Sequence, residues 1–188
     1  MAPFREFSDV KKWEDTFLTV RPRYQFLILH ADSRAGKTSF AESRFQNPFV
    51  VTVEDNPDLD LKGFDRAVHD GIVLDNCNSF GQLLGWRALL QARNTKTKGG
   101  QSATQMYAYA QYLFMIPIIA TVDFDAKDED LVQEGHPKRS KWLMQNAVVV
   151  RLGEGEAFYM PQGEVVGPPA HTLFARHLNA RRQPEAEP

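Results

Sequence analysis

The chain has 188 residues, of which 43% are hydrophobic, and its formal net charge is -2. This length suits one globular domain that buries its core without disulfides or structural metal. No apolar run approaches the roughly 20 residues of a membrane span, and the net charge argues against a whole-surface basic field for nucleic acid. The first nine residues lack the pattern of a secretory signal, and the lone Cys77 fits a reducing compartment. We therefore expect an intracellular protein, in either the nucleus or the cytoplasm.

Apolar runs and helical spacings alternate along the chain. Continuous apolar runs predict buried strands over 26–29, 49–53, 71–74, 116–122 and 147–152. Helix-compatible composition over 38–45 and helical spacing over 80–91 predict two helices, and the polar stretch 94–102 is expected to be a basic loop. This order favours an α/β fold with a mostly parallel sheet of about five strands, covered by helices on both faces, with ligands at the carboxyl ends of the strands.

The segment 31–38 fits the phosphate-binding pattern G-x-x-x-x-G-K-[ST], except that Ala31 replaces the first glycine. It lies between a predicted strand and a predicted helix, as the pattern requires. Lys37 is expected to face the outer phosphates, and the Thr38 hydroxyl to contact magnesium. The predicted nucleotide-binding residues are Ser33, Arg34, Ala35, Gly36, Lys37, Thr38 and Ser39. The pattern predicts a P-loop NTPase core with ATP and Mg²⁺ as cofactors.

A second acidic element follows the predicted strand at 71–74. Asp75 comes directly after the apolar run and is expected to hold magnesium beside Thr38, although an aspartate here can also cap a turn. Many ATPases carry a second acid at the next position, where this chain has Asn76. An amide orients water but cannot accept its proton, so hydrolysis is expected to be slow.

Four segments in this order resemble the superfamily 3 helicase domain of replication-initiator proteins of circular single-stranded DNA viruses and related plasmids. They are 29–38 as Walker A, 72–76 as Walker B, 96–100 as the basic loop called B-prime, and 116–123 as motif C. The resemblance implies a P-loop ATPase core that assembles as a ring, with Lys96 and Lys98 facing single-stranded DNA. It also places Asp123 where the family has a catalytic asparagine next to the γ-phosphate. A carboxylate there repels phosphate unless it is protonated or bound to metal.

These residues predict a division of the chain into an N-terminal lead-in over 1–23, a P-loop ATPase or helicase-like domain over 24–160, and a C-terminal helix with a flexible tail over 161–188. The predicted catalytic residues are Lys37, Asp75, Asn76 and Asp123. Three functions stay open. The first is an ATP-dependent ring motor on single-stranded DNA with weakened hydrolysis, the second a non-catalytic, nucleotide-dependent interaction module, and the third a small-molecule kinase with 126–141 as its lid. No membrane partner is expected.

Overall fold

The computed structural model describes residues 3–54, 59–91, 93, 97–101, 110–127 and 139–160. Its centre is a five-stranded sheet in the order β2-β3-β6-β1-β7, and every neighbouring pair of strands is parallel. The strands are β1 (Phe26–Ala31), β2 (Pro48–Glu54), β3 (Gly71–Ser79), β6 (Ile118–Lys127) and β7 (Ala147–Arg151). The predicted α/β fold and its five-stranded parallel sheet are confirmed.

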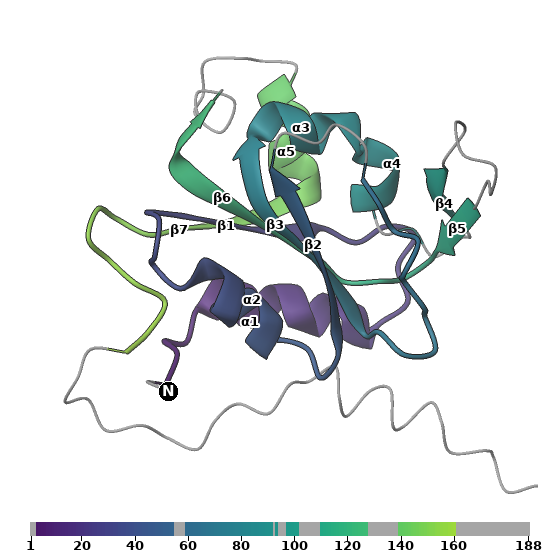
Figure 1. The fold of residues 1–188 in the computed structure, drawn as a ribbon. Helices are drawn as coiled ribbons and strands as arrows, with labels where there is room; N and C mark the ends of the chain where they lie inside the picture. The colour runs from purple at the N-terminus through teal and green to yellow at the C-terminus, as the bar shows by residue number, and fades with distance from the viewer. Residues whose placement is uncertain are drawn as a thin grey trace, which may run out of the picture.

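Helices cover both faces of the sheet (Figure 1). One face carries α1 (Ser8–Asp15), which a short 3-10 turn (Thr16–Leu18) follows, and α2 (Lys37–Ser43). The other face carries α3 (Phe80–Gly85), α4 (Arg87–Leu90) and α5 (Arg139–Asn146). Among the described residues, no helix is long and apolar enough to span a membrane.

Strand β1 is apolar on both sides because each side packs against a core. Leu27 and Leu29 pack with α1 and α2, whereas Phe26 and Ile28 point to the opposite core. All four side chains are fully buried, as expected for a central strand of a covered parallel sheet. Trp13 of α1 lies in the same core as Leu27, so the N-terminal segment before residue 24 contributes to the packing of the sheet.

Two local predictions are wrong. The single helix expected over 80–91 is divided into α3 and α4 at Trp86, whose backbone (φ -104°, ψ 28°) leaves the helical region directly after Gly85. The expected loop at 94–102 contains β4 (Thr97–Gln101), which pairs antiparallel with β5 (Ala110–Leu113). Figure 1 shows this hairpin beside α4.

Two further predictions lie wholly or mainly outside the described residues. These are the C-terminal helix and tail at 161–188 and most of the surface excursion at 126–141. The described ends of that excursion belong to β6 and α5.

Candidate functional site

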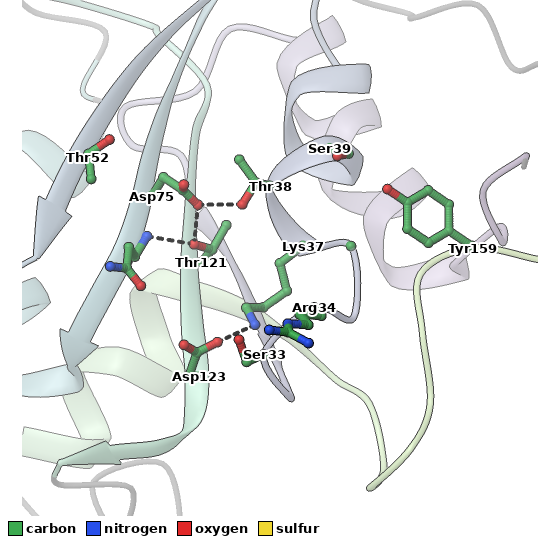
Figure 2. Close-up of a pocket in the computed structure, with 12 residues that line it drawn as sticks. Ser33, Arg34, Lys37, Thr38, Ser39, Thr52, Asp75, Thr121, Asp123 and Tyr159 are labelled. Carbon is green, nitrogen blue, oxygen red and sulfur yellow. Dashed lines mark hydrogen bonds and ion pairs between the residues drawn. The ribbon is translucent and has the colours of Figure 1, made fainter. Parts of the chain in front are cut away.

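The site arises where two strands change from apolar to polar on the face that α2 covers. On β3, Val73 packs in the core and Asp75, two residues later, reaches the same face. On β6, Ile119 packs in the core, and Thr121 and Asp123 follow at the same two-residue spacing. The two strands are parallel neighbours, so these polar side chains lie at the same level along the sheet and gather beside the start of α2 (Figure 2).

Together with the loop before α2, these side chains surround a cavity of about 420 Å³. The lining residues that the sequence predicted are Ser33, Arg34, Gly36, Lys37, Thr38, Ser39, Asp75, Asn76 and Asp123. Ala35, also predicted, is 5% exposed and belongs to the core under the loop. Sequence reasoning missed Thr52, Thr121 and Tyr159.

Lys37 points its ammonium back toward the end of β1. Its Nζ donates hydrogen bonds to the carbonyl oxygens of Ala31, at 3.1 Å, and Asp32, at 2.7 Å. The same Nζ forms an ion pair with Asp123, which lies opposite Ala31 on the neighbouring strand β6. Because the Lys37 side chain is only 8% exposed, these three partners supply much of the polar environment that water gives an exposed ammonium.

Asp75 is held by two hydroxyl groups. Thr38 Oγ1 donates to Asp75 Oδ1 at 2.8 Å, and Thr121 Oγ1 donates to the same oxygen at 2.7 Å. Thr121 is 1% exposed and also accepts a hydrogen bond from the backbone N–H of Asn76 at 2.9 Å. This network fixes the carboxylate of β3 against the first turn of α2.

Asp75 does not end its strand, contrary to the sequence expectation. β3 continues to Ser79, and its pairing with β6 changes register between Leu74 and Cys77. Within this bulge Asn76 has a φ of 60°, in the left-handed region, and is exposed. The bulge directs Asp75 and Asn76 into the cavity while the strand continues beyond them.

The loop between β1 and α2 has two residues in the left-handed region, Arg34 with φ 64° and Gly36 with φ 86°. Left-handed residues alternating with right-handed ones turn successive backbone N–H groups toward one side, which forms an anion-binding concavity. The segment after β7 holds this loop in place through two hydrogen bonds. The Ala35 carbonyl accepts one from Phe158 N at 2.8 Å, and the Asp32 carboxylate accepts one from Gly155 N at 3.0 Å.

Neither of the predicted nucleic-acid residues, Lys96 and Lys98, has a side chain in the described part of the structure. Lys98 lies on β4, where its backbone pairs with Tyr112, and its side chain is outside the described part of the structure. Lys96 lies outside the described residues altogether.

Cys77, next to the bulge, is a neutral thiol. Burial, with a smaller contribution from the Asp75 charge, raises the pKa of Cys77 to about 12. A neutral thiol is a poor metal ligand, since metals bind the thiolate. Among the described residues there is no group of three or more His, Cys, Asp or Glu side chains that could hold a metal ion.

In comparisons with known proteins, neither a family model nor a curated protein matches the chain.

Proposed function

We propose that this cavity binds the triphosphate and magnesium ion of ATP, so that the chain is a P-loop nucleotide-binding domain. The observation that carries the proposal is the 2.8 Å hydrogen bond between Thr38 Oγ1 and Asp75 Oδ1. It joins the hydroxyl of the Gly-Lys-Thr segment to a carboxylate from β3, 37 residues further along the chain. A hydroxyl and a carboxylate in this relation are the protein ligands that P-loop sites offer to magnesium.

The donor set fits magnesium because it consists of oxygen atoms. Mg²⁺ prefers oxygen ligands and is commonly bound by one or two carboxylates together with the phosphates of a substrate. When bound, the ion neutralises charge on the phosphate oxygens. Thr38 and Asp75 would hold the ion, because the hydrogen bond between them already brings the hydroxyl and the carboxylate together.

Lys37 supplies the positive charge for the phosphates. Its buried ammonium already has one anionic partner, the Asp123 carboxylate. A phosphate oxygen competes with Asp123 for this ammonium, and the two anions repel each other at short range. Triphosphate binding is therefore expected to displace Asp123 from Lys37.

The resemblance to superfamily 3 helicases extends this proposal to a ring-forming ATPase on single-stranded DNA. We expect slow hydrolysis, because Asn76 cannot accept a proton and Asp123 is paired with Lys37. The same ion pair favours a second candidate, a nucleotide-dependent interaction module without turnover. Both functions require Mg-ATP binding, and they differ in whether single-stranded DNA stimulates hydrolysis.

Calorimetric titration with Mg-ATP, together with turnover assays with and without single-stranded DNA, tests the proposal. We expect wild-type protein to bind Mg-ATP and Lys37→Ala to lose at least about tenfold in affinity, the loss of one charge-assisted contact. Lys12→Ala is the matched control, because Lys12 is 75% exposed and pairs with Asp9 on α1. Equal binding by all three proteins would contradict nucleotide binding in this cavity. Turnover that single-stranded DNA stimulates would support the ring-forming ATPase. Binding of Mg-ATP without turnover would support the interaction module.

A further inference from the structure

The cavity has two chemically different ends (Figure 2). Lys37, Asp75 and Asp123 gather at one end, where charge and hydroxyl groups dominate. Tyr159 lies on the far side of the loop and the first turn of α2. It is the one aromatic side chain among the described residues that line the cavity.

The Tyr159 ring packs directly against the loop backbone at Gly36. A Cβ added to Gly36 would collide with ring atoms of Tyr159, so the ring occupies the space that any other residue type would fill. Gly36 also has a φ of 86°, which disfavours a side chain. Glycine at this position therefore both shapes the loop and brings an aromatic ring beside it.

Contacts with the N-terminal segment 3–5 hold the Tyr159 ring in place. Phe4 stacks on Tyr159, with ring centroids 5.0 Å apart and planes at 22°. Backbone hydrogen bonds on either side hold the two segments together, from Met160 N to the Pro3 oxygen at 2.7 Å and from Arg5 N to the Phe158 oxygen at 2.8 Å. A ring already held in place loses little conformational freedom when a ligand packs against it.

Tyr159 is not a core residue like its neighbour Phe158. Phe158 is fully buried, whereas Tyr159 is half-buried at the cavity wall. Among the described residues, none is a hydrogen-bond partner of the Tyr159 hydroxyl. A ring that is partly exposed at the cavity wall can contact a ligand in the cavity, whereas the fully buried ring of Phe158 cannot.

We propose that Tyr159 packs against the nucleobase of the bound nucleotide while the charged end of the cavity takes the triphosphate. This inference rests on the proposed function and adds to it a contact for the base, which inorganic triphosphate lacks. Both ligands supply the anion for Lys37, but only the nucleoside adds a flat aromatic group that can stack on a ring. Tyr159 is then a specificity-determining residue of the site.

The test compares the affinities of ATP and inorganic triphosphate, each with magnesium, for wild type, Tyr159→Phe and Tyr159→Leu. Leucine keeps apolar bulk against Phe4 and Gly36 but removes the aromatic plane. Triphosphate binding reports whether the loop remains intact in each variant. Phe114→Ala is the control, because Phe114 is a 45% exposed aromatic outside the cavity.

We expect Tyr159→Leu to lower the affinity for ATP about tenfold, which is the usual effect of losing one aromatic stacking partner. Triphosphate affinity should stay unchanged, and Tyr159→Phe and Phe114→Ala should match wild type. If Tyr159→Leu lowers the affinities for ATP and for triphosphate equally, or changes neither affinity, Tyr159 does not contact the base and the inference is wrong. Failure of the proposed function looks different, since wild type would then bind neither ATP nor triphosphate.

Discussion

Lys37 and Asp123 form an ion pair inside the cavity although 86 residues separate them in the chain. The pair places an internal carboxylate on the ammonium that the proposed triphosphate needs. Asp123 is 32% exposed and Lys37 is 8% exposed, so the carboxylate can turn toward solvent more readily than the ammonium. On the proposed function, the triphosphate would compete with this carboxylate for the Lys37 ammonium.

Replacing Asp123 with asparagine should therefore strengthen nucleotide binding. Asp123→Asn removes a negative charge beside the phosphates, and Lys37 keeps its two carbonyl partners. We expect the Kd for Mg-ATP to fall about tenfold, equivalent to about 1.4 kcal/mol, as measured by calorimetry. Asp9→Asn, at a 61% exposed position on α1, controls for the change in net charge. An unchanged or higher Kd for Asp123→Asn would show that the ion pair does not oppose the ligand.

Thr121 should be required to hold Asp75 in place. Thr121→Val keeps the shape of the side chain but removes the donor to Asp75 and the acceptor for Asn76 N–H. The free energy of unfolding should fall by about 1–3 kcal/mol, the range for unsatisfied buried polar groups, with weaker magnesium-dependent ATP binding. Denaturant titration measures the first effect.

Thr52→Val is the matched control, because Thr52 lines the same cavity but is exposed on β2. It should change stability by less than about 0.5 kcal/mol. Equal effects of the two substitutions would mean that the Thr121 hydrogen bonds are not important.

A buried ion pair attaches α2 to α1. Arg44, directly after α2, bonds to Glu14 of α1 at 2.6 Å, and the two side chains are 15% and 3% exposed. Burial raises the pKa of Glu14, and the Arg44 charge partly offsets this rise. Arg44→Met leaves the carboxylate buried without its cation, so we expect a loss of about 3–5 kcal/mol at neutral pH.

The pH dependence of this loss has a definite sign. Without Arg44 the pKa of Glu14 should rise further above 4.5, so the folded variant binds a proton more readily than its unfolded chain. Its stability should therefore increase as the pH falls through the folded pKa toward 4.5, and the difference from wild type should shrink. The double variant Glu14→Gln, Arg44→Met should lose this dependence. A difference that grows on acidification would contradict the account.

Alkylation of the Cys77 thiol should occur only when the chain unfolds. Its pKa of about 12 and its 2% exposure leave almost no thiolate in the folded protein. Iodoacetamide at mildly alkaline pH should therefore leave Cys77 unmodified until denaturant unfolds the chain, as followed by mass spectrometry. Rapid modification of the folded protein would indicate that β3 opens locally near Asp75.

The sequence predicts the sheet well because its strands are continuous apolar runs that need a core on both faces. It predicts most of the cavity because Asp75 and Asp123 follow two of these apolar runs directly and Lys37 belongs to the Gly-Lys-Thr segment after a third. Thr121 could have been found, because it is a polar residue within an apolar run, two positions before Asp123.

The remaining differences depend on long-range contacts. The β4 strand forms by pairing with a later segment of the chain, as Thr97 pairs with Leu113, and the glycines and lysines of β4 alone do not predict this. Trp86 breaks a helix whose apolar spacing continues through it. Tyr159 reaches the cavity only because residues 152–160 run back under the loop, where Phe158 N bonds to the Ala35 oxygen.

The Kd for ATP with and without magnesium shows whether Thr38 and Asp75 together bind magnesium on the triphosphate. We predict that wild type binds ATP at least about tenfold more tightly with magnesium than without. Thr38→Val and Asp75→Asn should each abolish most of that difference, while Thr52→Val keeps it. If magnesium makes no difference to wild type, or if the two variants retain the full effect, the hydroxyl and carboxylate joined at 2.8 Å are not a magnesium site.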